Sequence, residues 1–311
     1  MAALAAPAIA ARAQQGEAPA AVKRTVERFA RLPSASCLVV SERAGGGWRT
    51  EHDARSRRFV GSAVKTFILA QFLRDVEAGR LSEDRPVAID DGVRSLSSPV
   101  FLGLAGTTPA RSVLEAMIAH SDNTATDAAM ALVGVDRIRG LIKEAGLAET
   151  QIVDSTRRLF SYLAGAADGV DVGWDGMQKI AAGDQFGPPR AAVNDRQTMM
   201  STAEELVRWY RLALRGEFFG KPETLREFKR IQATATALSQ VVPGDVVSYG
   251  KGGSIDWNGF HAVSLPGQMI VDGAPTTFCF TINWTGEDGT VAPTFAEYRE
   301  AVAAILAEVA R

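Results

Sequence analysis

The first sixty residues show two different spacings of apolar positions, and each spacing predicts one kind of element. Apolar residues at intervals of three and four predict a helix over residues 22–31. The apolar, valine-containing run 36–43 predicts a strand. Residues 48–60 follow a run of glycines and predict a second strand with its exit loop. The chain therefore begins with a helix followed by two strands.

The middle of the chain has mostly helical periodicity. An apolar stripe predicts a long helix from Ser62 to Leu81, with Gly79 near its end. Residues 111–149 predict two or three further helices. Glycines and prolines are frequent over residues 153–200, where periodicity is weak. We expect a long loop there, at a functional surface.

The last third of the chain returns to strands. A helix is predicted over residues 201–215, with Ser201 or Thr202 as its N-cap. Three strand-like runs and a closing amphipathic helix follow, over residues 246–256, 259–265, 276–284 and 293–310.

This order of elements predicts an α+β fold. An antiparallel sheet flanked by the terminal helices would be completed by both chain ends, with an all-α domain inserted between them. We expect a leader at residues 1–20 and an α/β domain made of 21–61 and 201–311. Residues 62–200 would form the all-α domain with its long loop.

Composition and charge exclude several classes of function. The formal net charge is −2 and no basic run is present, so we expect no nucleic-acid partner. The three histidines are not paired at metal-ligand spacing, and we predict neither a metal nor a cofactor. Cys37 and Cys279 lie in strand-like apolar runs. We expect two small buried hydrophobic residues rather than a disulfide.

The N-terminus is rich in alanine and ends in a candidate processing site. Ala11-Arg12-Ala13 has the small-x-small pattern of a signal cleavage site before Gln14. We therefore expect an exported protein, periplasmic or secreted; the alternative is an alanine-rich leader on a cytosolic protein. No apolar run of the sequence is long enough to span a bilayer.

The first candidate for chemistry is Ser62-Ala63-Val64-Lys65, at the start of the long predicted helix. Residues three apart share a helix face, so a hydroxyl and an amine lie side by side. A serine becomes a good nucleophile when a neighbouring base accepts its proton, and a buried lysine can be that base. Alone, the pattern is also compatible with a helix cap followed by a surface lysine.

The second candidate is Ser121-Asp122-Asn123. These are favoured helix-capping residues, and an N-cap is the simpler interpretation. In the functional interpretation, Ser121 carries a proton to a leaving nitrogen and Asn123 binds a substrate amide. Asp122 would be a buried structural anchor.

The third candidate is Lys251-Gly252-Gly253 in a strand-like run. Glycine weakens a strand and often marks the close approach of a ligand or another backbone. The alternative is a hairpin turn. In the functional interpretation, this edge strand lines a cleft, Lys251 holds a substrate carboxylate and the N–H of Ser254 stabilises an oxyanion.

Together, the three elements resemble the S-x-x-K, S-D-N and K-T-G motifs of class A β-lactamases and penicillin-binding proteins, in the same order. The chain is thus similar to the penicillin-recognising D,D-peptidase and β-lactamase superfamily over roughly residues 20–311. The resemblance implies a two-part fold with the active site at the junction.

The resemblance also implies residue roles. Ser62 would be the acylated nucleophile, Lys65 its base or proton relay, and Ser121 a second proton carrier. Substrate contacts would come from Asn123 and from a wall formed by Lys251 and Gly253. The N–H groups of Ser62 and Ser254 would form the oxyanion hole. Gly252 stands where the family has threonine or serine, which removes a hydroxyl contact.

One family feature is missing. Class A enzymes have a glutamate in an E-x-x-L-N pattern that activates the water for deacylation, and no glutamate occurs between Glu149 and Glu204. The nearest match is the run 156–165. In this run, Phe160, Ser161 and Tyr162 would lie near the expected place. A solvated loop carboxylate is the simpler interpretation of each aspartate in the long segment, but all are candidate replacement bases: Asp168, Asp171, Asp175, Asp184 and Asp195.

Three functions remain open at this point. The first is a serine acyl-enzyme hydrolase of a β-lactam or a related amide or ester, secreted and associated with antibiotic resistance. The second is a D,D-peptidase, transpeptidase or esterase acting on cell-wall-like peptides. The third is a module that is acylated without turnover. Each implies a small-molecule partner, and we expect a monomer without a membrane span.

Overall fold

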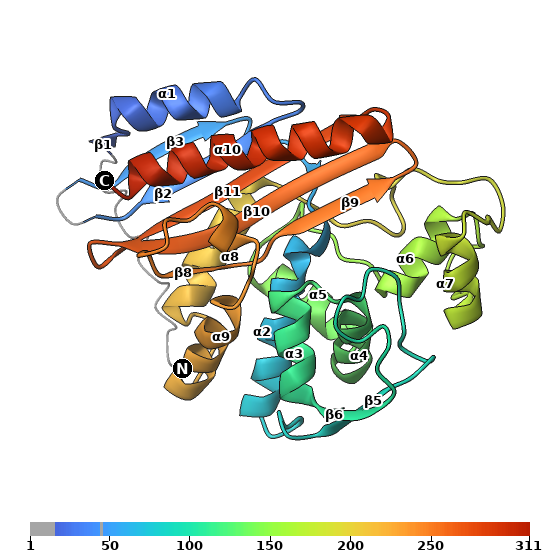
Figure 1. The fold of residues 1–311 in the computed structure, drawn as a ribbon. Coiled ribbons are helices and arrows are strands. Elements are labelled where there is room, and N and C mark those ends of the chain that lie inside the picture. The colour runs from blue at the N-terminus through green and yellow to red at the C-terminus, as the bar shows by residue number, and fades with distance from the viewer. Residues whose placement is uncertain (1–15, 44–45) are drawn as a thin grey trace, which may run out of the picture.

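The structure is a computed structural model that describes residues 16–43 and 46–311. Its centre is a seven-stranded sheet in the order β1-β3-β2-β11-β10-β8, with β9 also paired to β10 (Figure 1). All pairs are antiparallel except β1 with β3. The strands are β1 (Gly16–Glu17), β2 (Ser36–Ser41), β3 (Trp48–His52), β8 (Ser248–Gly250), β9 (Gly253–Trp257), β10 (Phe260–Val271) and β11 (Ala274–Thr285).

Helices from both chain ends cover one face of this sheet. α1 (Ala20–Phe29) and α10 (Val291–Val309) lie side by side there, while α8 (Ala203–Arg215) packs on the opposite face (Figure 1). The ring of Phe29 packs edge-on against Phe280 of the sheet and Tyr298 of α10. Apolar burial between these layers holds the two chain ends together. The predicted α+β fold is confirmed.

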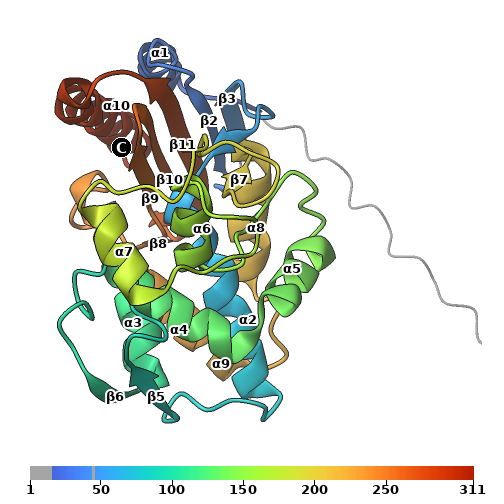
Figure 2. The same cartoon turned by 90° about the vertical axis from the view of Figure 1, so that its right-hand side faces the viewer.

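A helical layer fills the other half of the molecule. Figure 2 shows α2 (Lys65–Glu77) running through this layer, where it packs against α4, α5 and α9. Most of α2 is buried because it is apolar on nearly every side, as expected of a central helix. The other elements of the layer are β5 (Pro86–Ile89), β6 (Gly106–Pro109), α3 (Ala110–Ala119), α4 (Asn123–Val133), α5 (Val135–Glu144) and α9 (Pro222–Gln232).

The layer therefore also contains a small two-stranded sheet, β5–β6, and the helix α9 from the C-terminal segment. The domain boundaries drawn from the sequence stay a prediction. No helix among the described residues combines the length and the apolar character needed to cross a membrane. The expected leader falls mainly on residues 1–15, outside the described part of the chain.

The expected long loop over 153–200 was only partly correct. This segment contains two helices, α6 (Thr156–Leu163) and α7 (Gly173–Ala181), and ends in β7 (Met200–Ser201), which pairs with β4 (Arg58–Phe59). Ser155 caps α6 by accepting a hydrogen bond from the N–H of Arg158. Both helices are short, so their periodicity is hidden between glycines.

The predicted strand 246–256 is interrupted. Its two parts, β8 and β9, pair with β10 in one continuous register on either side of the gap. The residue of β10 opposite the gap is Pro266, whose carbonyl accepts from the N–H of Lys251. Proline has no backbone N–H and cannot donate a hydrogen bond back to Lys251. The hydrogen-bond ladder therefore breaks at Lys251-Gly252.

Both cysteines are free and fully buried, on β2 and β11. Burial raises the pKa of Cys37 and of Cys279 to about 12. They act as small core residues, as the sequence predicted.

Candidate active site

Ser62 lies in a tight turn against the edge of the sheet. It belongs to a 3-10 helix, η1 (Gly61–Val64), which leads directly into α2. Gly61 has φ +53°, and a Cβ there would lie 2.8 Å from the carbonyl oxygen of Ser254. A Cβ on Gly253 would lie 2.7 Å from the nitrogen of Ser62. Glycine at both positions lets the two backbones touch, which brings the N–H groups of Ser62 and Ser254 to the same place.

Lys65 joins the first two sequence elements. Its side chain is only 2% exposed. The Nζ atom lies 2.7 Å from the backbone oxygen of Ser121, 2.7 Å from Oδ1 of Asn123 and 3.3 Å from the hydroxyl of Ser121. Among the described residues no hydrogen bond joins Ser62 and Lys65, and the hydrogen bonds of Nζ go to the S-D-N element.

The environment of Lys65 favours its neutral form. The pKa of Lys65 is lowered well below its usual value, first by burial and then by the positive charge of Lys251. Asp127 and Asp122 oppose this shift without reversing it. The backbone oxygen of Ser121 and Oδ1 of Asn123 both accept from Nζ, and the hydroxyl of Ser121 is its third, longer contact.

The S-D-N element is a helix cap and part of the site at once. Asp122 is fully buried and is the N-cap of α4, accepting from the N–H of Ala125 at 2.8 Å. Its other oxygen accepts from the N–H groups of Val100 and Phe101, both at 2.9 Å. Ser121, with φ +59°, turns the chain into this cap. The capping interpretation therefore applies to Asp122, and the functional interpretation applies to Ser121 and Asn123, which contact Lys65.

Lys251 is buried beneath the strand edge, at 3% exposure. Its Nζ donates to the oxygen of Gly252 at 2.5 Å, and burial lowers its pKa to about 7. Lys251 lines a cavity of about 180 Å³ that His120, Ser121 and Ser254 also line. A Cβ on Gly252 would lie 2.6 Å from the Cβ of Ala237. Ala237 thus occupies the space that the family's threonine or serine side chain would need.

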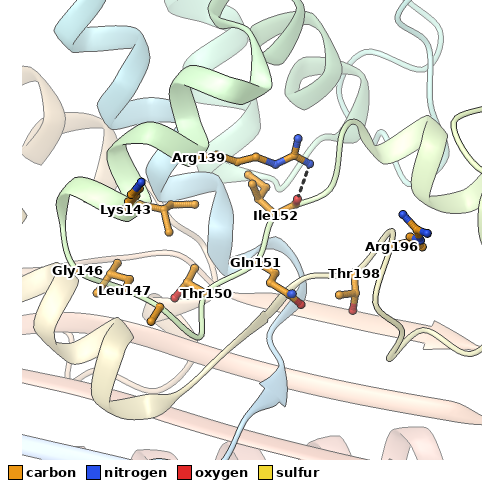
Figure 3. A pocket seen from close by; sticks show the side chains of 11 residues that line it. Arg139, Lys143, Gly146, Leu147, Thr150, Gln151, Ile152, Arg196 and Thr198 are labelled. Atoms are coloured by element: carbon orange, nitrogen blue, oxygen red, sulfur yellow. Dashed lines mark hydrogen bonds between the residues drawn. The ribbon is translucent and has the colours of Figure 1, made fainter.

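A larger cavity of about 620 Å³ opens over Ser62. Of the predicted site residues it is lined by Ser62, Lys65, Ser121, Asn123 and Ser254, while Lys251 and Gly253 line the adjoining smaller cavity. The two cavities share His120, Ser121 and Ser254 and so form one cleft. A third cavity, of about 490 Å³, lies beside α5 and is lined by Arg139, Gln151 and Thr198 (Figure 3). It contains no predicted site residue.

The structure places none of the five candidate aspartates against the Ser62 cavity. Asp171 pairs with Arg157 at 2.5 Å, and Asp168 lies 3.9 Å from Arg196. The remaining three are exposed, namely Asp175, Asp184 and Asp195. The alternative in which one of them replaces the glutamate has no support in the geometry, and the simpler interpretation as loop carboxylates fits their exposure.

The cavity wall on the α6 side is formed by Thr156, Leu159 and Phe160. Of the three residues expected near the position of the missing glutamate, only Phe160 reaches the cavity. Ser161 is buried and donates to the carbonyl of Arg157, and Tyr162 stacks under Arg190. None of these side chains is a base at neutral pH.

Sequence reasoning missed Thr156 and Asp127. Thr156 lines the cavity, and its hydroxyl lies 2.7 Å from that of Ser95. Asp127 is buried and accepts from the N–H groups of Thr156 and Arg157 at 2.7 and 3.0 Å, which anchors the start of α6. Burial raises its pKa to about 6. Two signals pointed to them: T-R-R-L-F aligns Thr156 with the first position of E-x-x-L-N, and Asp127 lies one helical turn after Asn123.

A two-part fold with a serine at a helix start, a buried lysine and a converging S-D-N element defines a serine hydrolase of the acyl-enzyme type. A model of the beta-lactamase enzyme family matches residues 22–267, and the chain belongs to that family. It is a β-lactamase-like serine hydrolase. No curated protein matches the chain.

Several solved structures share the fold at low sequence identity. A β-lactamase from Chitinophaga pinensis is 17% identical, with a TM-score of 0.71, covering 93% of this chain and 98% of its own. A β-lactamase from Sphaerobacter thermophilus is 17% identical, with a TM-score of 0.69 and coverages of 93% and 95%. PBP-A is 15% identical, with a TM-score of 0.69 and coverages of 94% and 98%.

Proposed function

We propose that the protein opens a β-lactam, or a related amide or ester, through a covalent acyl-enzyme on Ser62, and that it hydrolyses this intermediate slowly. The observation that carries the proposal is the geometry of Lys65. Burial lowers the pKa of its amine well below the usual value, and its Nζ lies 3.3 Å from the hydroxyl of Ser121 in the cleft that contains Ser62.

In acylation, the hydroxyl oxygen of Ser62 forms a bond to the substrate carbonyl carbon. The Ser62 proton passes to Lys65, and the backbone N–H groups of Ser62 and Ser254 stabilise the oxyanion. Ser121 then delivers a proton to the leaving nitrogen as the C–N bond breaks, and Lys65 reprotonates Ser121. Asn123 binds the substrate amide, and the Lys251–Gly253 wall receives the end of the substrate that carries a carboxylate.

Deacylation requires a base for water, and the α6 wall offers Thr156, Leu159 and Phe160 instead of a carboxylate. His120 and Asp256 line other parts of the cavity, and we assign the role of base to Lys65, whose pKa is lowered by burial. An amine already engaged in several contacts is a poor substitute for a dedicated carboxylate, so we expect the acyl-enzyme to be long-lived. A PBP-A mutant of the same fold is known as an acyl-enzyme complex with penicillin G.

The test combines a chromogenic cephalosporin with intact-mass spectrometry. We expect a burst of about one equivalent, a mass adduct on Ser62 and slow steady turnover. Ser62→Ala should abolish all three, while Ser239→Ala, at an exposed serine, should behave as the parent protein. Ser121→Ala should slow acylation by about 10²–10⁴-fold, the usual contribution of a proton-transfer group. A parent protein that never forms the adduct would contradict the proposal.

A peptide assay and the lifetime of the adduct distinguish the two alternative functions. Release of D-alanine from a peptide ending in D-Ala-D-Ala, at a rate above β-lactam turnover, would assign the protein to cell-wall peptides instead. An adduct that never decays would assign it to acylation without turnover.

We further propose that the alanine-rich N-terminus directs export, that the mature protein is a monomer, and that it protects a bacterium against β-lactams. Expression of the full chain in a Gram-negative host tests all three. The expected results are a periplasmic product beginning at Gln14, a light-scattering mass near 32 kDa, which follows from 33.1 kDa less the leader, and a raised inhibitory concentration of penicillin.

A further inference from the structure

Three side chains with metal-binding atoms converge at the end of β9, on elements distant in sequence. Asp256 lies on β9, His261 on β10, and Asp288 in a short 3-10 helix, η3 (Asp288–Thr290), just before α10. Their ligand atoms all lie within 4.8 Å of one another. Figure 1 shows the end of β9 and the start of α10 at the same edge of the sheet.

The sequence builds this arrangement through a tight hairpin. Asn258 and Gly259 both have positive φ, at +49° and +75°, as a two-residue Asn-Gly turn requires. Such a turn fixes the register of the flanking strands, so Trp257 pairs with Phe260 and Asp256 stands directly opposite His261. The turn back from β11 brings in Asp288, where the N–H of Gly286 donates to the oxygen of Gly259 at 2.9 Å.

One ring nitrogen of His261 has a hydrogen-bond partner, and the other has none among the described residues. Its side chain is fully buried, and Nε2 lies 2.9 Å from the carbonyl oxygen of Gly286. A carbonyl only accepts, so Nε2 carries the hydrogen. Nδ1 is buried without a hydrogen-bond partner, although Oδ1 of Asp256 is only 2.8 Å away.

A neutral His261 would therefore place the Nδ1 lone pair beside a carboxylate oxygen, and two acceptors at that distance require a positive charge between or beside them. A proton on Nδ1 would satisfy both atoms only along a straight N–H···O line, and the pair lacks that alignment. Metal binding does not require a linear arrangement between the two ligand atoms. Each ligand directs its lone pair at the ion, and the ligands are spread around it.

We propose that His261 Nδ1, Asp256 and Asp288 bind a divalent metal ion of the zinc class, with water completing the coordination. Imidazole with carboxylates suits Zn²⁺ better than Mg²⁺ or Ca²⁺, which prefer oxygen ligands alone. The bond from Nε2 to the Gly286 carbonyl is the usual outer contact that orients a metal-binding histidine. Both carboxylates are exposed and free to rotate onto the ion.

Binding would tie the edge strand β9 to β10 and to the start of α10. The same strand carries Gly253 and Ser254, and Asp256 itself lines the cleft over Ser62. The ion would thus fix one wall of the cleft without contacting Ser62. This inference does not depend on which substrate the cleft accepts.

The test is calorimetric titration of the metal-stripped, untagged full chain with ZnCl₂. We expect one site, weakened at least about tenfold by Asp288→Asn, since even an outer contact of a metal site contributes that much. Asp288 is exposed and lines neither cavity of the cleft, so the variant should fold normally. Asp272→Asn removes the same charge from an exposed turn at the far end of β10 and should bind as the parent protein does.

Nitrogen NMR of the His261 ring gives an independent readout. Zn²⁺ should shift Nδ1 and leave Nε2 protonated. The proposal is overturned if the parent protein binds no Zn²⁺, if Asp288→Asn binds it unchanged, if Mg²⁺ binds equally well, or if both ring nitrogens remain protonated in its presence.

Discussion

Replacing Gly253 with alanine tests the close contact on which the proposed oxyanion hole depends. The new Cβ would lie 2.1 Å from the oxygen of Val60, 2.5 Å from the nitrogen of Ala63 and 2.7 Å from that of Ser62. All three are backbone atoms of the turn that carries Ser62, the proposed nucleophile. Because no side chain can rotate away, β9 and the turn must separate.

The size of the separation follows from these distances. Ordinary contact begins at 3.4 Å, so the nearest pair, now at 2.1 Å, must move apart by about 1.3 Å. A displacement of that size at a reacting centre costs about 100-fold in rate. Overpacking of a well-packed site should also lower the free energy of unfolding by about 1–3 kcal/mol. The protein should fold and acylate slowly.

Stopped-flow measurement of the acylation burst with a chromogenic cephalosporin gives the rate directly. Gly244→Ala is the matched control, because no atom lies within 4 Å of a Cβ at that position and its φ is ordinary. Equal acylation rates in the two variants would refute the claim that the backbone contact at Gly253 positions the oxyanion donors.

Three further predictions follow from the charged and polar groups around the cleft. Lys251→Met removes a positive charge that helps to lower the pKa of Lys65, so this pKa should rise. In the proposed mechanism acylation needs neutral Lys65 and slows as pH falls, so the acid limb of the acylation rate should move to higher pH. An unmoved pH–rate profile would contradict this. Thr156→Glu should speed loss of the mass adduct, mainly above neutral pH because Asp127 nearby disfavours a second negative charge; an unchanged adduct lifetime at pH 8 would count against it. Asp127 has its pKa raised to about 6 in the folded protein, so it weakens folding as pH rises from about 4 to 6, by roughly 3 kcal/mol; the melting temperature of Asp127→Asn relative to the parent should therefore increase over that range, and a constant difference would disprove the shift.

The sequence was sufficient for the elements with long, regular patterns. The helices α1, α8 and α10 were predicted because each buries one clear face, and the strands β2 and β11 because they are short apolar runs that are buried on both faces. Ser62, Lys65, Ser121 and Asn123 could be named because their motifs have fixed spacing. The contacts of Ser121 and Asn123 with the amine of Lys65 depend on how α2 and α4 pack, and sequence spacing does not contain that information.

Other features depend on partners far along the chain. The break between β8 and β9 is caused by Pro266 on the neighbouring strand, so the pattern of residues 246–256 alone predicts one strand. The α6 wall was missed because Thr156 looks like an ordinary helix-start residue. The cluster of Asp256, His261 and Asp288 combines a hairpin pair with a residue from another loop, and no local spacing reveals it.

The hydrogen bonds of Asp122 determine how partial unfolding would affect the proposed activity. One buried carboxylate starts α4, holds the backbone at Val100 and Phe101, and separates the two residues that contact Lys65. The proposed catalytic groups are therefore brought together by the same interactions that fold this part of the chain. Partial unfolding that releases the start of α4 would therefore abolish acylation of Ser62 while the central sheet is still folded. Labelling of Ser62 by a fluorescent β-lactam would then count intact molecules in a mixed sample, and stability screening of variants could use that label in place of a melting curve.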